Sequence, residues 1–499
     1  MRRRPSTLLA VLLSVSALTA ACGLKQEQYD ALKQQQQNGG TTGDNGAGGS
    51  SSATTGDGST GVATSGVTGI GGTSTTGDLT TGSTSGTSGT SGTSGTSGTS
   101  GTTGTTGTSG SASSGTTGPT SGKCSTLGQN VPGVTPTQIR IGVHAPQTGT
   151  GAPFPPSFEA AVPLYWKDPA HKVCGRQVVI DFQDDKYTPQ TARDVCGPMS
   201  RRDFLVIGAA GTDQIQSCAT MPDIEGKGVP YLSAGVTTNG LTGLQHYFAL
   251  TLTYAQQASL VLRNAQQQHL GMKKWAVITS NTNNFKDARQ AMEGVLSAAG
   301  VKYDDIQVDA TNDNGIQGRA ASTGTKIATG GYDTVFLDTS PGYFLYMSST
   351  ASKQGFSGTY TGPGVTMTEV TVAQLVCAGT AGVVKANFLA PYPGIDHATA
   401  DFKKAANNSY DDIYWSIWGL SNSLFNALNA ADSLTRPGFI SGLSKATLHN
   451  VVYPNSVFAG GSHFGGTAAW SQKMNCSETE PNASQPGAWD TVGSAPLVK

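Results

Sequence analysis

The stretch Gln138-Ile-Arg-Ile-Gly-Val-His144, followed by the loop Ala145-Pro-Gln-Thr-Gly-Thr-Gly151, decides the fold. Apolar and polar residues alternate along the first part, which is typical of a β-strand with one buried face. The glycines of the loop permit turn conformations that are closed to other residues. Because we expect a helix to begin near Ser157, this stretch is the opening strand, loop and helix of an α/β fold.

The same unit repeats along the chain in two series. The first series is predicted to contain strands 178–182, 204–208 and 230–233 and helices 188–196 and 213–225. The second series is predicted to contain helices 254–269 and 285–299 and strands 275–280 and 334–337. Strands that alternate with helices favour mostly parallel sheets. The sequence therefore predicts two α/β lobes with a cleft between them.

A late helix is predicted from apolar residues spaced three and four apart. These residues share one face, which we expect to pack against a sheet: Ile413, Ile417, Leu420, Leu424, Leu428 and Ala431. Ligands of open parallel sheets bind beyond the carboxyl ends of the strands. We therefore expect the functional residues in the loops that follow the predicted strands.

The first 21 residues have the pattern of an export signal. Arg2, Arg3 and Arg4 are basic, residues 8–18 form a short apolar stretch, and small residues lead into Cys22. This end resembles the lipobox of bacterial lipoproteins, although Thr19 stands where that family usually has leucine. The resemblance implies a lipid on Cys22 and attachment to the cell membrane on its extracytoplasmic face. An ordinary secretory signal with an incidental cysteine is the alternative.

Residues 38–123 are predicted to form a disordered tether, joined to the anchor by the segment 22–37. Gly, Ser and Thr dominate this stretch, and no aromatic residue occurs between Tyr29 and Phe154. Such a chain cannot bury enough apolar surface to offset its ordering entropy. Its length gives an r.m.s. span of roughly 50 Å, and its contour is much longer when the chain is pulled taut, which could clear a thick cell wall. The threonines could carry O-linked sugars, although solubility alone explains the composition.

Composition and motifs argue against several classes of function. The formal net charge is -1 and no basic cluster follows the N-terminal arginines, so we expect no nucleic acid partner. The sequence has no G-x-S-x-G elbow, no H-E-x-x-H motif and no P-loop, and its seven histidines are scattered singly. We therefore expect no enzyme activity, no catalytic residue, no metal and no cofactor. His463, beside Gly465 and Gly466, fits a surface turn better than a metal site.

Six cysteines lie in the predicted folded region, an even number that favours disulfides in an exported chain: Cys124, Cys174, Cys196, Cys218, Cys377 and Cys476. No two of them have the C-x-x-C spacing of a metal or redox site. Cys196 and Cys218 flank one predicted strand, and we pair these two. The partners of the other four stay open.

Four segments together resemble the branched-chain amino acid binding proteins: Ile139–Gly149, Asp184-Asp185, Ile207-Gly208 and Ser233–Thr237. The segment Gly460–Thr467 is similar to the C-terminal part of actinobacterial members. These proteins are the extracytoplasmic solute receptors of ABC importers. The resemblance implies the type I periplasmic-binding-protein fold, with two Rossmann-like lobes and parallel sheets joined by a three-segment hinge. It places lobe 1 at 137–250 plus about 388–452, and lobe 2 at 251–387 plus about 453–499.

The resemblance also implies which residues bind the ligand. The loop Ser233–Thr237 matches the one whose amides and hydroxyl hold a ligand's polar head, and Phe285 matches an aromatic residue that covers the ligand. Residues 212–214 precede a helix and would offer free amides to a carboxylate. The expected contacts are Thr148, Thr212, Asp213, Gln214, Ser233, Gly235, Val236, Thr237, Phe285, Asp338 and Thr339. Several of them equally suit helix caps, turns or strand ends.

One departure from the family concerns the ligand. Amino-acid-binding members carry an acidic residue after Gly-Pro, where this chain has Gly362-Pro363-Gly364. A buried ammonium without a counter-charge is costly. An amino acid therefore fits only if Asp338 or Asp213 substitutes, and a neutral or acidic small molecule is an equal alternative.

Together these features predict a monomeric, lipid-anchored solute-binding protein. It would capture a small polar molecule, such as an amino acid or an amide, and deliver it to an ABC permease by closing its lobes. A cell-surface receptor or structural module that keeps the fold without transport is the main alternative. A sensor for a signalling partner is another.

Overall fold

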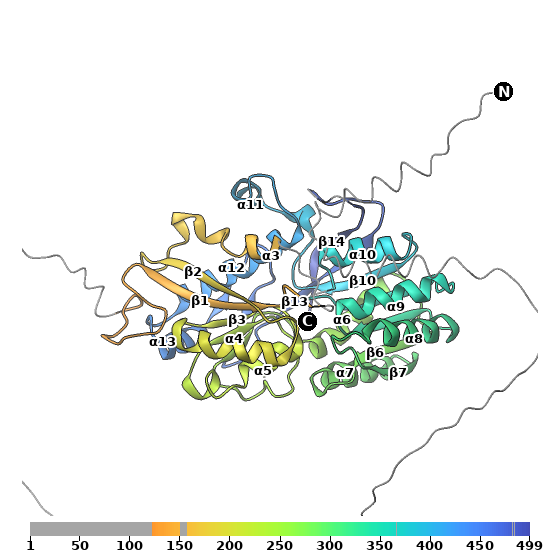
Figure 1. Cartoon of the computed structure of the whole chain (residues 1–499), viewed down its shortest axis with the longest axis horizontal. Coiled ribbons are helices and arrows are strands. Elements are labelled where there is room, and N and C mark those ends of the chain that lie inside the picture. The colour runs from red at the N-terminus through yellow and green to blue at the C-terminus, as the bar shows by residue number, and fades with distance from the viewer. Residues whose placement is uncertain (1–121, 150–156, 366, 482, 484) are drawn as a thin grey trace, which may run out of the picture. The chain divides into compact units, whose positions relative to one another are not determined.

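The computed structural model describes residues 122–149, 157–365, 367–481, 483 and 485–499 (Figure 1). All of them belong to one compact unit. The export signal, Cys22, the segment 22–37 and the expected tether up to residue 121 lie outside the described residues. Cleavage, lipidation and disorder therefore stay predictions. Within the described ranges, no helix is long and apolar enough to cross a membrane.

A five-stranded parallel sheet forms the centre of lobe 1, with strand order β2-β1-β3-β4-β5. Its strands are β1 (Gln138–Ala145), β2 (Gln177–Asp184), β3 (Val206–Gly208), β4 (Tyr231–Ser233) and β5 (Tyr247–Ala249). Ile139 and Ile141 are fully buried while Gln138 and Arg140 are exposed, as the alternation predicted. The connecting helices are α3 (Ser157–Ala161), α4 (Pro189–Arg202) and α5 (Thr212–Ala219).

A seven-stranded sheet forms the centre of lobe 2, with strand order β14-β13-β10-β9-β8-β6-β7. Five strands are parallel: β6 (Lys274–Ser280), β7 (Lys302–Val308), β8 (Thr334–Asp338), β9 (Thr359–Pro363) and β10 (Lys385–Ala390). β13 (Ala468–Asn475) and β14 (Ala488–Val498) complete it as antiparallel strands. Its helices are α6 (Tyr254–Gln267), α7 (Lys286–Ala298), α8 (Ile316–Thr329), α9 (Pro341–Lys353) and α10 (Val370–Gly379).

The late helix α12 (Asp412–Ala430) packs against the sheet of lobe 1, although it follows all five parallel strands of lobe 2 in the chain (Figure 1). Trp415, Leu424 and Leu428 share a hydrophobic core with Ile139 and Ile141 of β1. Of the apolar face expected from the sequence, Leu420 is only half-buried and the others are buried. The shorter α11 (Ala400–Ala405) and α13 (Arg436–Leu443) flank α12 in the chain.

The chain passes between the two sheets three times, after β5, after β10 and before β13. The strand pair β11 (Thr447–Leu448) and β12 (Ser456–Val457) precedes the last passage. Phe458 packs edge-on against Phe248 at 5.5 Å between ring centroids, and the Ala249 amide donates to the His463 carbonyl. The segment 456–464 thus lies with lobe 1, whereas the sequence analysis assigned residues from about 453 onward to lobe 2. The second assigned boundary, at about 388, falls inside β10.

Three disulfides join the six cysteines of the folded region. Cys196 on α4 is bonded to Cys218 on α5, the pair expected from the sequence. The other two bonds, which the sequence left open, join Cys124 to Cys174 and Cys377 to Cys476.

The predicted fold class is confirmed, since both lobes contain mostly parallel sheets covered by helices. The predictions differ from the structure mainly in polar or short elements. β7 reads Lys-Tyr-Asp-Asp-Ile-Gln-Val and lies at the edge of the sheet, where only two of its residues are buried. Its sequence therefore has too few apolar residues to indicate a strand. The helix expected over 213–225 ends at Ala219, and a separate 3-10 turn covers Glu225–Lys227.

Candidate functional site

A cavity of about 330 Å³ lies between the lobes and is here called the outer cleft. It opens where β2, β6 and β7 end, as expected for parallel sheets. From lobe 1 it is lined by Tyr187, Thr188, Pro189, Thr212, Asp213 and Gln214. From lobe 2 it is lined by Ser280, Asn281, Thr282, Phe285, Asp309, Ala310, Thr311, Asn312 and Ser340. Most of these side chains offer a hydroxyl, an amide or a carboxyl group.

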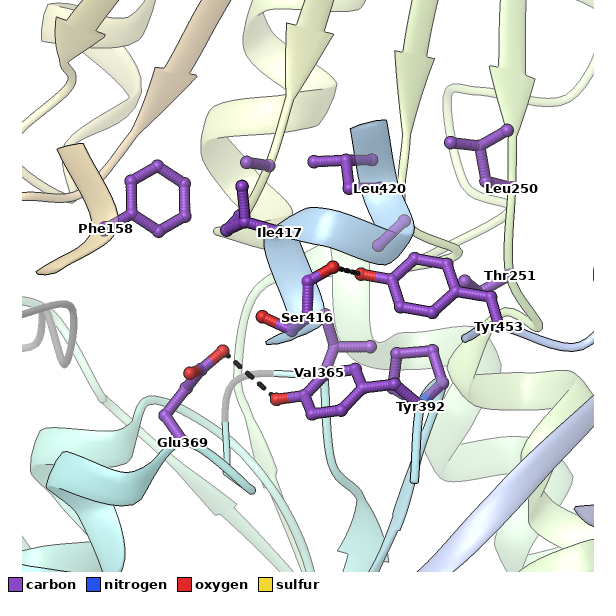
Figure 2. Close-up of a pocket in the computed structure, with 13 residues that line it drawn as sticks. Phe158, Leu250, Thr251, Val365, Glu369, Tyr392, Ser416, Ile417, Leu420 and Tyr453 are labelled. Atoms are coloured by element: carbon purple, nitrogen blue, oxygen red, sulfur yellow. Dashed lines mark hydrogen bonds between the residues drawn. The ribbon is translucent and has the colours of Figure 1, made fainter. Parts of the chain in front are cut away.

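A smaller cavity of about 40 Å³, here called the hinge pocket, lies where the chain crosses between lobes (Figure 2). Its lining is mostly apolar or aromatic: Phe158, Ala209, Ala234, Leu250, Thr251, Val365, Glu369, Pro391, Tyr392, Ser416, Ile417, Leu420 and Tyr453. The Tyr392 hydroxyl donates to Glu369 Oε1 at 3.4 Å. The Tyr453 hydroxyl donates to the Ser416 carbonyl at 2.8 Å.

Two predicted ligand contacts bond directly to the opposite lobe. The Thr237 hydroxyl donates to Asp287 Oδ1 at 3.1 Å, and the adjacent Thr238 donates its amide and hydroxyl to Asp287 Oδ2. Asp213 Oδ1 accepts from Thr282 Oγ1 at 3.2 Å and from Asn284 Nδ2 at 2.5 Å. These bonds hold the lobes together at the outer cleft.

The remaining residues of the loop Ser233–Thr237 are satisfied within lobe 1. Ser233 Oγ lies 2.8 Å from the Tyr247 hydroxyl and donates to the Ala234 carbonyl. The Gly235 amide donates to Thr251 Oγ1 at 2.8 Å, and Val236 is fully buried. Glycine is required at 235, since a Cβ there would lie 2.2 Å from the Thr251 carbonyl oxygen. In this conformation the loop therefore offers few free groups to a ligand.

Three other predicted contacts line the outer cleft or lie beside it. Thr212 Oγ1 is 3.3 Å from the Tyr254 hydroxyl, and the Tyr254 ring stacks on Phe285 at 6.1 Å between centroids. Gln214 lines the cleft and is buried. Thr148 is exposed and bonds to Asp184, and Thr339 is buried without lining either cavity.

Asp338 ends β8 with an unpaired carboxyl oxygen. Its residue is 4% exposed, and its Oδ2 has no hydrogen-bond partner among the described residues. Burial, and then the charge of Asp287, raise the pKa of this carboxyl well above its usual value. The group is therefore protonated over a wider pH range than an exposed aspartate.

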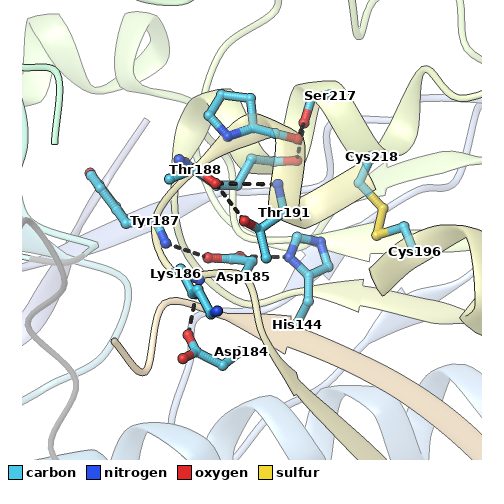
Figure 3. A network of polar contacts seen from close by, with 12 residues as sticks. His144, Asp184, Asp185, Lys186, Tyr187, Thr188, Thr191, Cys196, Ser217 and Cys218 are labelled. Carbon is cyan, nitrogen blue, oxygen red and sulfur yellow. Dashed lines mark hydrogen bonds and ion pairs between the residues drawn. A yellow bond between two sulfur atoms is a disulfide. The ribbon is translucent and has the colours of Figure 1, made fainter. Parts of the chain in front are cut away.

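A buried network, which the sequence analysis did not predict, holds the turn after β2 (Figure 3). His144 Nδ1 lies 2.8 Å from Asp185 Oδ2, and His144 Nε2 lies 2.7 Å from the Tyr231 hydroxyl. Asp185 Oδ1 accepts from the Tyr187 amide at 3.0 Å. Lys186 and Tyr187 both have a left-handed backbone, with φ of 54° and 57°. The network thus holds a strained turn that brings Tyr187 to the outer cleft.

The same network lies beside the Cys196–Cys218 disulfide. Nitrogen and sulfur atoms of His144, Cys196 and Cys218 lie within 4.8 Å of one another, close enough to suggest a metal site. Both sulfurs are bonded to each other, however, and both ring nitrogens have hydrogen-bond partners. This group is therefore structural in the oxidised protein.

Sequence comparison now decides the family. The model of the periplasmic binding protein family matches residues 138–479, which span both lobes. The chain belongs to this family. No functionally curated protein is significantly similar to it in sequence.

Solved structures of such binding proteins have the same fold as this periplasmic binding protein. A fatty acid ABC transporter substrate-binding protein from Thermomonospora curvata is 16% identical, with a TM-score of 0.59 over 73% of this chain and 95% of that chain. A solute-binding protein from Rhodopseudomonas palustris BisB5, in complex with 3,4-dihydroxybenzoic acid, is 16% identical, with a TM-score of 0.58 over 72% and 98%. The leucine-binding protein of Thermotoga maritima is 13% identical, with a TM-score of 0.57 over 72% and 98%.

This binding protein also contains an acidic group that the sequence analysis missed. Glu369, five residues beyond Gly364, lines the hinge pocket and is 3% exposed. Burial, and then the charge of Asp411, raise the pKa of its carboxyl well above the usual range. Asp412 and Glu480 lie close enough to interact with it electrostatically, and the pKa of Glu480 is raised to about 8, mainly by burial. The only sequence signal was a lone glutamate before an apolar helix, which usually marks a helix start.

Proposed function

We propose that this periplasmic binding protein captures a small molecule between its lobes and delivers it to an ABC permease. The outer cleft carries the proposal, because its walls come from both lobes and its volume of about 330 Å³ suits a small ligand. A ligand that contacts both walls binds the closed form better than the open one. The ligand therefore increases the population of the closed conformation, and a permease can recognise that conformation.

The donors and acceptors around the outer cleft support a polar ligand. Thr212, Gln214 and Phe285 were expected to contact it and do line the cavity. Tyr187, Asn281 and Asn312 add groups that the sequence did not suggest. Ligand contacts of Thr237 and Gly235 would require these groups to exchange their present bonds to Asp287 and Thr251.

A ligand screen with cleft variants tests this function. Thermal shift and calorimetry on the full-length protein should find a small molecule that binds and raises the melting temperature. Thr212→Val and Phe285→Ala should each weaken that binding by roughly 10-fold or more. Thr325→Ala, on the exposed face of α8, is the matched control. Binding that neither cleft variant alters would refute this location.

We also propose that the protein is a monomer held on the extracytoplasmic face of the cell membrane by a lipid on Cys22. The supporting features are the basic, apolar and small-residue order before Cys22 and the tether composition. Cys22→Ser should release the protein from the membrane fraction, and mass spectrometry should find acyl chains on the wild-type cysteine alone. An unmodified wild-type cysteine would instead support an ordinary secretory signal.

A receptor or structural role without transport is the second candidate, favoured by the bonds between the lobes. Asp287 and Asp213 hold the lobes together with protein groups alone. If small-angle scattering shows that the ligand-free protein is fully closed, and if no compound changes its radius of gyration, the receptor or structural role explains the protein better than transport does.

A further inference from the structure

The cavities between the lobes carry acidic groups and lack basic ones. Of the described residues that line the outer cleft and the hinge pocket, none is Lys, Arg or His, whereas Asp213, Asp309 and Glu369 are acidic. An anionic ligand would therefore meet no side-chain counter-charge in these walls. The Gly235 amide, a candidate donor to a carboxylate, already donates to Thr251.

Glu369 is the acidic lining residue with an unsatisfied oxygen. Asp213 accepts two hydrogen bonds, and Asp309 forms an ion pair with Arg319 at 3.5 Å. Glu369 Oε2 is buried and has no hydrogen-bond partner among the described residues. Its other oxygen accepts only the long bond from Tyr392 at 3.4 Å. A buried carboxylate left this way is costly, so it needs either a proton or a cation.

The position of Glu369 is fixed, and aromatic rings lie close to it. Its backbone carbonyl accepts from the Trp489 indole at 3.1 Å, which holds the residue at the start of α10. Tyr392 and Tyr453 stack at 5.9 Å between centroids and both line the hinge pocket. Figure 2 shows the Glu369 carboxyl beside the Tyr392 hydroxyl and opposite Ser416 of α12. A carboxylate flanked by aromatic rings is a favourable environment for an organic cation.

The size of the hinge pocket limits the group that can enter it. A volume of about 40 Å³ exceeds what one water molecule needs and admits an ammonium head group. Asp338, whose Oδ2 is also buried and unpaired, provides a second acidic group in lobe 2.

We propose that the ligand is a small organic ammonium compound without a carboxylate, whose N–H groups donate to Glu369 Oε2 in the hinge pocket. This inference rests on the proposed function, since it names the class of ligand that would bind between the lobes. It places the ammonium group in the hinge pocket, whose lining residues are separate from those of the outer cleft. This ligand class differs from the amino acid, or the neutral or acidic molecule, expected from the sequence. That expectation rested on Gly364, which has no acidic side chain, whereas the structure shows an unpaired carboxyl group on Glu369.

Binding of a cation should release a proton. Burial, and then the charge of Asp411, raise the pKa of Glu369 well above its usual value, so the free protein holds this proton to a higher pH than an exposed glutamate does. The titratable groups that face it are Asp411, the N-cap of α12, Asp412 of α12, Glu480 between β13 and β14, and the hydroxyls of Tyr392 and Tyr453. An ammonium ligand requires the ionised carboxylate. Its affinity should therefore rise with pH, by up to about 10-fold per unit, while Glu369 remains protonated in the free protein.

Calorimetry with four probes of one carbon skeleton tests the inference on the full-length protein. Propylamine, propanol, propionate and alanine differ in charge but not in the three-carbon body. Propylamine should bind roughly 30-fold or more tightly than propanol and propionate, as expected for a charged hydrogen bond. Glu369→Gln should remove this preference and the rise of affinity with pH. Glu478→Gln, on the exposed turn nearby, should change neither.

Proton release in the wild type gives a second readout that needs no variant. The apparent binding enthalpy of propylamine should differ between phosphate and Tris buffers by the difference between the ionisation enthalpies of the two buffers, multiplied by the number of protons released. Preferential binding of propionate, propanol or alanine, unaffected by Glu369→Gln, would overturn the ligand class and leave the proposed function standing. If neither these probes nor the compounds of the wider ligand screen bind, the proposed function itself is refuted, and the ligand class with it.

Discussion

Thr237 of lobe 1 donates its hydroxyl to Asp287 Oδ1 of lobe 2 at 3.1 Å, so the two lobes are joined by a direct hydrogen bond. Thr238 adds two further bonds to the same carboxylate. Hydrogen bonds to a charged group contribute more than neutral ones. The closed arrangement is therefore stabilised before any ligand arrives, and ligand affinity depends on how strongly these bonds favour closure.

Removal of the Asp287 carboxylate should open the ligand-free protein. Asp287→Ala deletes the acceptor of all three bonds, which weakens closure by roughly 1–3 kcal/mol. Small-angle scattering should show a larger radius of gyration than for the wild type. Asp401→Ala, an exposed residue at the start of α11, is the control. Because Asp287 also accepts from the Ala288 amide, the double variant Thr237→Val with Thr238→Ala should open the protein in the same direction but less, since the bond from the backbone amide of residue 238 remains. Unchanged scattering from both variants would contradict the assignment.

The stability of the protein should fall as pH rises from about 5 to 8. The pKa of Glu480 is raised from an ordinary value of 4.5 to about 8, mainly by burial, so the folded protein keeps a proton that the unfolded chain has lost. The folded state then binds more protons, and the free energy of unfolding decreases with pH by at most about 1.4 kcal/mol per unit for this group. Urea unfolding at a series of pH values measures this slope. Glu480→Gln should reduce this slope without abolishing it, because Glu369 and Asp338 also have raised pKa values. An unchanged slope in that variant would mean that Glu480 does not contribute to it.

Gly235→Ala should destabilise the protein. The new Cβ would lie 2.2 Å from the Thr251 carbonyl oxygen and 2.4 Å from the Leu252 carbonyl, both backbone atoms at the first hinge crossing. Such overpacking typically costs about 1–3 kcal/mol. Gly294→Ala provides a matched control, since no atom lies within 4 Å of a Cβ there and alanine suits the interior of α7. Thermal unfolding should show opposite shifts for the two variants.

Loss of the Cys377–Cys476 disulfide should lower stability by about 2–5 kcal/mol. The bond joins α10 to the turn after β13 and closes a loop with a sequence separation of 99. The double variant Cys377→Ala with Cys476→Ala should unfold at a lower urea concentration than the wild type. A single variant is unsuitable, because it leaves a reactive thiol. An unchanged midpoint would mean that the packing of α10 against β14 is sufficient alone.

The elements that the sequence predicted best are those with strong periodicity. β1 alternates cleanly, and α12 repeats apolar residues at the helical spacing, so both could be placed without a structure. β5, β13 and β14 were not predicted, since their pairing depends on contacts distant in the chain. The disulfides of Cys124 and Cys377 were undetermined for the same reason.

The site was only partly predictable, for a physical reason. Residue type identified Thr212 and Phe285 as candidate contacts, and both line the outer cleft. It could not show that Thr237 and Asp213 bond to the opposite lobe, because those partners lie 50 and more residues away. Nor could it show that Glu369 is buried in the hinge pocket, since an isolated glutamate before a helix is common at exposed positions.

The Cys377–Cys476 bond has a consequence for where the protein can mature. It ties the helix that begins after Glu369 to the turn that leads into Glu480, so one covalent link holds together two of the acidic groups at the hinge. In a reducing compartment such a bond does not persist. The spacing of these two acidic groups is therefore covalently fixed only in an oxidising compartment, and in the reduced chain it would depend on the packing of α10 alone.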